Sequence, residues 1–70
     1  MVGYKVEVYV DHEYCGNALV FPTKDEAEGY GQALSRAWIL VKDSRVLEIN
    51  EAPNYHWVGP GNHDIVPIKS

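Results

Sequence analysis

The spacing of apolar residues in the first part of the chain predicts a β-hairpin. Apolar side chains stand at every second position of residues 4–10, namely Tyr4, Val6, Val8 and Val10. This period of two is typical of a strand with one buried face. A polar stretch follows at residues 11–14, and a second apolar run covers residues 18–21. We therefore expect strands near residues 4–10 and 15–21, joined as an antiparallel pair.

The next segment has the pattern of an amphipathic helix with its start signal. Thr23 precedes Glu26 by three residues, the spacing of a capping box. At about 100° per residue, five side chains share one face of this helix: Ala27, Tyr30, Leu34, Trp38 and Val41. The pattern predicts a helix over residues 24–42 that buries this face, Leu34 and Trp38 included, against a sheet.

Shorter apolar runs complete the fold prediction. One run at residues 45–50 predicts a third strand, and the handedness of crossovers favours its pairing beside the first, in sheet order 2-1-3. Residues 54–58 and 65–68 flank a Gly-Pro-Gly turn and predict two short strands. We predict one α+β domain over residues 1–70, with a three- to five-stranded, mainly antiparallel sheet and one helix on one face, in the order ββαβ(β).

Length and composition favour association of the folded chain. Seventy residues, 46% of them hydrophobic, lie near the lower limit for an independent core. The helix carries a second, shallow apolar flank of small side chains: Gly29, Ala33, Ala37 and Leu40. We predict self-association through this strip, most simply as a homodimer, with a free edge of the sheet as the competing surface.

The two glycines within the predicted helix leave two interpretations open. Gly29 and Gly31 each cost up to about 1 kcal/mol relative to alanine in a helix. Either another group approaches the helix backbone closely at these positions, or the helix simply tolerates both glycines.

Charge and cysteine content narrow the class of protein. A formal net charge of -4 with six scattered basic residues argues against a nucleic-acid binder. The single cysteine excludes an internal disulfide and suits a reducing cytoplasm. No apolar run is long enough to cross a membrane, so we expect a cytoplasmic protein without membrane contact.

No constellation in the chain indicates catalysis. His12, Cys15, His56 and His63 lack the close doublets of zinc ligands, so we predict no metal, no cofactor and no enzymatic activity. The aromatic segment Tyr55, His56 and Trp57 follows Asn54 and has two interpretations. Its side chains either complete the core or contact a partner protein, and we take all three as the candidate partner-binding residues.

Most of the chain resembles a group of short uncharacterised proteins encoded by bacteriophages and bacteria. The residues that carry this resemblance are Gly16, Asn17, Ala18, Leu19, Phe21, Thr23, Glu26, Ala27, Glu28, Tyr30, Gly31, Leu34, Trp38, Arg45, Val46, Glu48, Pro53, Asn54, Tyr55 and Trp57. The resemblance implies a phage or bacterial origin and a partner in the host cell. It implies no catalytic residue.

Two functions fit these observations. The first is a non-catalytic protein–protein interaction module that acts on a host component. The alternative is a small-ligand-binding protein whose pocket is formed by a dimer.

Overall fold

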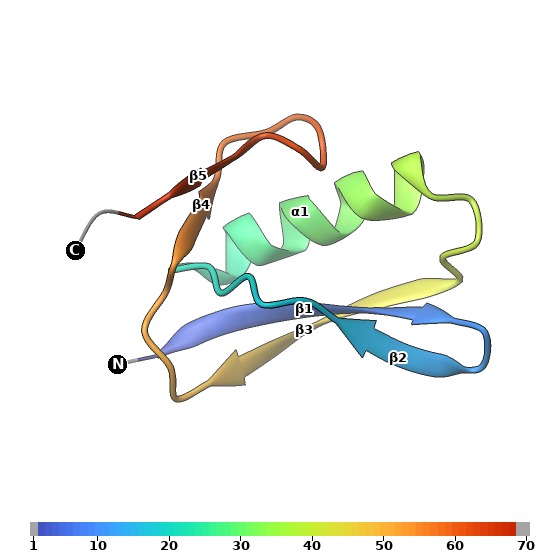
Figure 1. Ribbon diagram of the computed structural model, residues 1–70, viewed down its shortest axis with the longest axis horizontal. Helices are drawn as coiled ribbons and strands as arrows, with labels where there is room; N and C mark the ends of the chain where they lie inside the picture. Colours follow the sequence, from blue (N-terminus) through green and yellow to red (C-terminus); the bar gives the residue numbers. More distant parts are fainter. Residues whose placement is uncertain (1, 69–70) are drawn as a thin grey trace.

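A computed structural model describes residues 2–68 and shows one helix packed against a mainly antiparallel sheet. Figure 1 shows this arrangement, with α1 on one face of the sheet and a separate hairpin against the helix. The elements are β1 Gly3–Val10, β2 Glu13–Gly16, α1 Lys24–Ala37, β3 Asp43–Ile49, β4 Tyr55–Trp57 and β5 Ile65–Pro67. The main sheet has the order β2-β1-β3, while β4 and β5 form a two-stranded sheet of their own. The predicted α+β class and the 2-1-3 order are confirmed.

The first hairpin turns earlier than the sequence predicted. Val10 pairs with Glu13, and the two turn residues Asp11 and His12 have φ angles of 52° and 69°. Positive φ at both central positions gives a turn whose twist matches that of the strands, and Asp tolerates this conformation better than most residues. All of β2 is exposed, so no apolar alternation marked it. Residues 18–21 leave the sheet, although Phe21 still bridges to Tyr4.

Helix α1 begins as predicted and ends five residues early. The Thr23 side chain accepts the Glu26 N–H at 3.2 Å, as the capping signal required. The helix ends at Ala37, and Trp38 is already extended, with φ -125°. The chain must then turn back into β3, and a hydrogen bond from the Lys42 N–H to the Tyr9 carbonyl at 2.9 Å fixes that return. The predicted helical end at residue 42 is therefore wrong.

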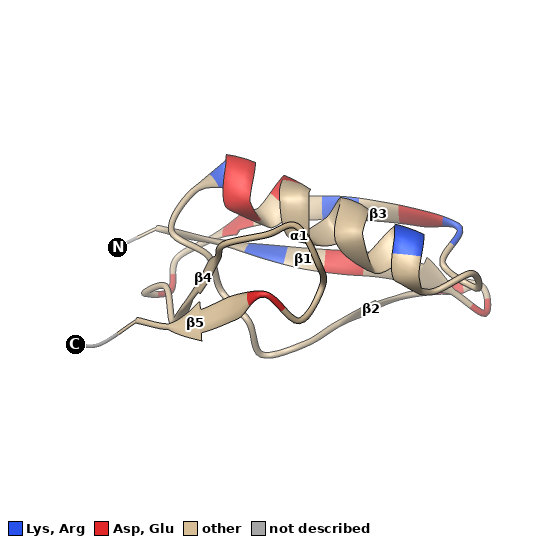
Figure 2. Cartoon of the chain, turned by 90° about the horizontal axis from the view of Figure 1, so that it is seen from above, with Lys and Arg blue, Asp and Glu red and all other residues tan. Residues whose placement is uncertain are grey.

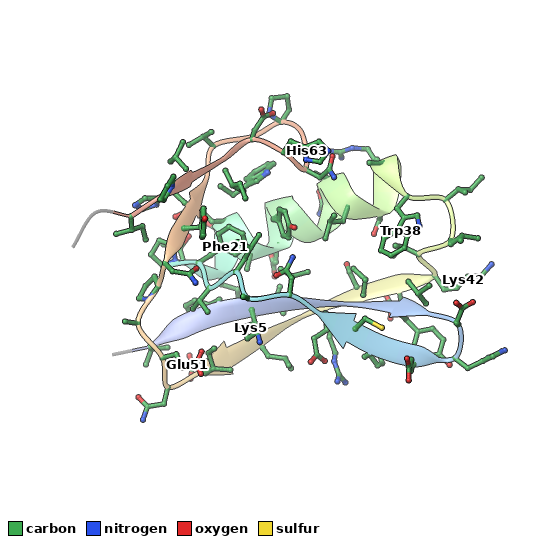
Figure 3. All side chains as sticks on the ribbon, in the orientation of Figure 1. Lys5, Phe21, Trp38, Lys42, Glu51 and His63 are labelled. Carbon is green, nitrogen blue, oxygen red and sulfur yellow. The ribbon has the colours of Figure 1, made fainter. Side chains whose placement is uncertain are left out.

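The core lies between β1 and the first two turns of the helix. Val6, Val8 and Val10 face Phe21, Ala27 and Tyr30, and Phe21 is completely buried. Figure 3 labels Phe21 in the layer between helix and sheet. Its ring centroid lies 5.1 Å from that of Tyr30. Burial of such a ring contributes about 1.5–3 kcal/mol, a large share of the stability of so short a chain.

Asn54 attaches the second hairpin to the body of the fold. Its side chain accepts the Val20 N–H at 2.7 Å and donates to the Ala18 carbonyl at 2.8 Å. Its backbone N–H also donates to the Val20 carbonyl at 2.9 Å. One amide side chain thus fixes the point from which β4 runs toward α1.

Candidate functional site

Trp57 in β4 packs against the helix at a glycine. A Cβ atom built on Gly29 would overlap the Trp57 ring, and one on Gly59 would come within 2.8 Å of it. The indole N–H donates to the Gly61 carbonyl at 3.0 Å. The group that approaches the helix backbone at Gly29 is therefore an aromatic ring of the same chain. Only a residue without a side chain leaves room for it.

Glu26 connects the start of the helix to the same hairpin. Its Oε1 accepts the Trp57 backbone N–H at 2.8 Å and lies 3.0 Å from His56 Nδ1. Its Oε2 is 3.3 Å from the Thr23 hydroxyl. The carboxylate that the sequence assigned to the helix cap thus also holds β4 in place.

The three predicted partner-binding residues take part in contacts within the chain. Tyr55 and Trp57 are partly buried and pack against the core, while His56 is exposed beside Glu26. Of the two interpretations of this segment, packing onto the fold is the one that the geometry of Tyr55 and Trp57 supports. The helix and the following loop occupy one side of the Trp57 ring.

The predicted self-association strip is not one open surface. Gly29 lies under the Trp57 ring, and Ala33 is 3% exposed. Ala37 is exposed at the end of the helix, and Leu40 lies beyond it. The strip is divided because the β4–β5 hairpin covers the flank to which Gly29 belongs. A second helix has no access to that flank.

An exposed apolar segment follows the helix instead. Trp38, Ile39 and Leu40 are 45%, 91% and 56% exposed, and we call them the 38–40 segment. The prediction that Trp38 is buried is wrong. The sequence did contain a signal, because residues 38–41 are four consecutive large apolar residues. Four consecutive positions span about 300° of a helix, so no single face can bury them all.

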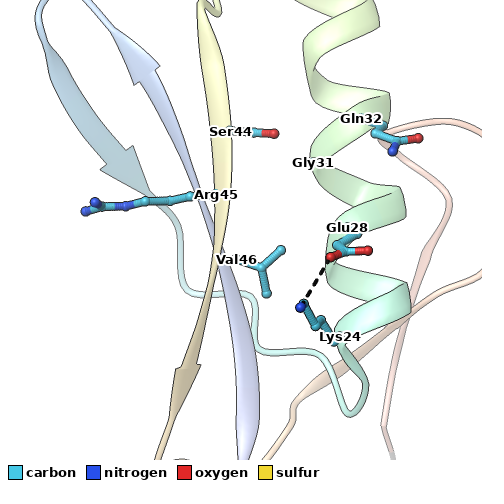
Figure 4. A pocket seen from close by; sticks show the side chains of 7 residues that line it. All are labelled: Lys24, Glu28, Gly31, Gln32, Ser44, Arg45 and Val46. Atoms are coloured by element: carbon cyan, nitrogen blue, oxygen red, sulfur yellow. Dashed lines mark ion pairs between the residues drawn. The ribbon is translucent and has the colours of Figure 1, made fainter.

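A shallow groove runs along β3 on the helix side. Two adjacent hollows of about 230 and 320 Å³ share Lys24 and Val46 in their walls, and Figure 4 shows the first of them between α1 and β3. The remaining lining residues are Tyr4, Glu28, Gly31, Gln32, Ser44, Arg45 and Glu48. The Tyr4 hydroxyl donates to Glu48 Oε1 at 3.2 Å, and this hydrogen bond is the main cause that raises the pKa of the Tyr4 phenol.

The opposite face of the sheet carries a network of charged and aromatic side chains. Arg45 donates from Nε and Nη2 to Glu7 Oε1 at 2.9 and 2.6 Å, and its guanidinium lies 3.8 Å from the centre of the Tyr14 ring. Tyr9 packs against Tyr14 with 5.0 Å between ring centroids. Figure 3 shows Lys5 on this face, pointing away from α1. Arg45 is thus held by its own chain.

Residues suited to metal chemistry are dispersed. Within residues 2–68 no group of three His, Cys, Asp or Glu side chains is placed to hold a metal ion. His12 lies in the tight turn of the first hairpin, and Cys15 is exposed on β2. In the same part of the chain, no helix has the length and apolar character needed to cross a membrane. Figure 2 shows acidic and basic positions interspersed along the helix and strands.

Comparison with known proteins adds no assignment. No protein-family model, no curated protein and no solved structure matches the chain.

Proposed function

We propose that the chain is a non-catalytic protein-interaction module and that the 38–40 segment is its binding anchor. The supporting observation is the exposure of three consecutive large apolar side chains, with Ile39 at 91%. Exposed apolar runs lower solubility, so where a folded protein has one it commonly marks an interaction site. Tryptophan is also among the residues that most often dominate the energy of protein interfaces.

The surroundings of the 38–40 segment indicate the kind of surface that it fits. Arg36 precedes the segment and Lys42 follows it, and both side chains are exposed. A partner that presents an apolar pocket with an acidic rim would complement this arrangement. Burial of Ile39 alone in such a pocket is worth about 1.5–3 kcal/mol. The resemblance to short phage and bacterial proteins makes a bacterial protein the first class of partner to test.

The experiment uses a matched pair of single substitutions. Ile39→Asp and Val58→Asp each place a charge at an exposed apolar position, since Val58 is 62% exposed and lies in the loop between β4 and β5. Tagged wild-type protein captures partners from bacterial lysate, and the affinity of each captured, purified protein is then measured for all three chains. We expect Ile39→Asp to weaken binding at least about tenfold, roughly 1.4 kcal/mol, and Val58→Asp to leave it unchanged.

A fluorescence measurement provides a second readout of the same contact. Because Trp57 already packs on Gly29, binding at the 38–40 segment should shift the emission of Trp38 alone toward shorter wavelengths. A captured partner that binds Ile39→Asp as tightly as wild type, with no emission shift, would contradict the proposal.

A further inference from the structure

The free edge of β3 is the longest unpaired strand edge in the sheet. β3 pairs with β1 from Gly3↔Ile49 to Tyr9↔Asp43, and no strand of residues 2–68 pairs with its other side. The strand has seven residues and contains neither glycine nor proline. The other edge strand, β2, has only four residues. An edge of this kind presents main-chain donors and acceptors to a further strand.

Hydrogen bonding at Tyr4 identifies the backbone groups of β3 that face outward. The Tyr4 N–H and C=O both bond to Phe21, at 2.9 and 2.8 Å, so they point away from β3. Tyr4 lies opposite Glu48, which makes this a non-hydrogen-bonded pair of the β1–β3 ladder. Because the pattern alternates, the N–H and C=O of Glu48 and Val46 point to the free edge. The N–H and C=O of Ser44, two residues before Val46, also point to the free edge. The Ser44 N–H donates to Asp43 Oδ1 at 2.9 Å.

We infer that two copies of the chain pair through these β3 edges into one antiparallel sheet with the order β2-β1-β3-β3-β1-β2. A two-fold axis normal to the sheet places Val46 opposite Val46 of the second copy. Each Val46 N–H then donates to the opposite Val46 carbonyl, and each Glu48 N–H to the opposite Ser44 carbonyl. This surface is distinct from the 38–40 segment, so either proposal can fail without the other.

Side-chain charges favour this register over its neighbours. With Val46 on the axis, the Ser44 hydroxyl faces Glu48 of the second copy, and Arg45 faces Leu47. A shift that centres Arg45 would place two guanidinium groups opposite each other. A shift that centres Leu47 would place Glu48 opposite Val46 and so remove it from the Ser44 hydroxyl. Like charges directly opposite each other destabilise a strand pair.

The position of α1 over the sheet lets the two helices pack beside each other. A Cβ on Gly31 would lie 3.2 Å from Val6 of β1 and 3.3 Å from Ser44 of β3, so the helix sits above the gap between these strands. Strands lie about 4.8 Å apart, so each helix would lie about 5 Å from the two-fold axis. The two helices would therefore be about 10 Å apart. Packed helices prefer 8–10 Å. Figure 2 shows the β4–β5 hairpin on the side of α1 away from β3, which leaves this flank free.

The groove beside β3 supplies complementary charges for the same pairing. Lys24 and Glu28 lie 3.8 Å apart on the free flank, and Figure 4 shows Val46 beside this stretch of the helix. The two-fold axis near Val46 reverses the second helix, so Lys24 of each copy meets Glu28 of the other. The second copy thereby closes the hollows that line β3.

The test combines oligomeric state with amide exchange. We expect sedimentation equilibrium of the full chain to show a dimer at submillimolar concentration. Hydrogen exchange followed by NMR should show protection of the Val46 and Glu48 amides that rises with concentration, while the Tyr14 amide in β2 exchanges equally fast in dilute and concentrated samples. Val46→Pro removes an N–H that has no partner within one copy and should give a monomer.

Charge reversal keeps the test decisive even if Val46→Pro does not fold. Lys24→Glu should weaken dimerisation roughly fivefold, since two exposed ion pairs of about 0.5 kcal/mol are lost. The double variant Lys24→Glu with Glu28→Lys should restore it, because both intrachain and interchain pairs are re-formed with reversed signs. A monomer at submillimolar concentration, or a dimer whose Val46 and Glu48 amides stay unprotected, would overturn the inference.

Discussion

Trp38 and Trp57 both lie next to helix α1, and their environments are opposite. Trp57 rests on Gly29, and its indole N–H donates to the Gly61 carbonyl at 3.0 Å. Trp38 ends the helix with 45% of its surface exposed, although its backbone N–H still reaches the Leu34 carbonyl at 2.9 Å. The two environments differ because the β4–β5 hairpin packs on the helix beside Trp57 and does not cover Trp38. This hairpin covers the helix at Gly29 and reaches Arg36 through the Pro60 carbonyl, but it leaves Trp38 exposed.

The comparison shows how a small chain divides its apolar surface. A chain of 70 residues is too short to cover both its three-stranded sheet and every flank of its helix. The hairpin adds a second layer against the helix, and Gly29 lets the Trp57 ring come close to the helix backbone. Within residues 2–68, the 38–40 segment and the outer edge of β3 stay uncovered.

Truncation of the two tryptophans should have very unequal effects on stability. Trp57→Ala removes a ring packed on the helix and should lower the free energy of unfolding by about 3 kcal/mol. Trp38→Ala removes a half-exposed ring and should cost less than about 1 kcal/mol. Urea unfolding followed by far-UV circular dichroism measures both. Equal losses for the two variants would break the comparison.

Gly29→Ala should destabilise the protein although alanine is the better helix former. The propensity gain is about 1 kcal/mol, but the new methyl group overlaps the Trp57 ring and should cost about 2–3 kcal/mol. We expect a net loss of about 1–2 kcal/mol. Gln32→Ala, at an exposed site of the same helix, is the control and should change stability by less than about 0.5 kcal/mol.

A double-mutant cycle measures how much of the cost of Gly29→Ala comes from the Trp57 ring and how much from the helix itself. In a Trp57→Leu background the overlap is relieved, so Gly29→Ala should become stabilising by up to about 1 kcal/mol. A loss of the same size in both backgrounds would show that the cost at Gly29 does not come from Trp57.

Sequence patterns predicted those elements that bury a face by themselves. The alternation of Val6, Val8 and Val10 marked β1, and Thr23 with Glu26 marked the start of α1, because local chemistry determines both. β2 escaped the pattern because it buries no side chain and its position follows from the tight turn at Asp11 and His12. The turn and the pairing with β1 place β2, and neither of them appears as an apolar alternation.

The site residues were harder to predict for a related reason. Helical periodicity placed Trp38, and strand alternation placed Trp57, without any knowledge of the layer that β4 and β5 form. The glycine at position 29 was a valid sign of close approach, yet it did not show that the approaching ring belongs to the same chain. The end of the helix was missed because residues 38–41 continue the apolar character without a glycine to stop it.

The smallest expected effect concerns the hydrogen bond from the Trp57 N–H to Glu26, which holds the hairpin in addition to the Trp57 ring. Glu26→Ala removes the acceptor of the Trp57 N–H, which lies 2.8 Å away in a partly buried position, and should cost about 1 kcal/mol. Glu26→Gln keeps an oxygen that can accept this N–H, so it should cost less than about 0.5 kcal/mol. Urea unfolding measures the difference, and acrylamide quenching reports whether Trp57 becomes more accessible. If the two variants lose the same stability, the charge beside His56 matters more than the acceptor, and the ring on Gly29 is left as the main attachment of the hairpin to the helix.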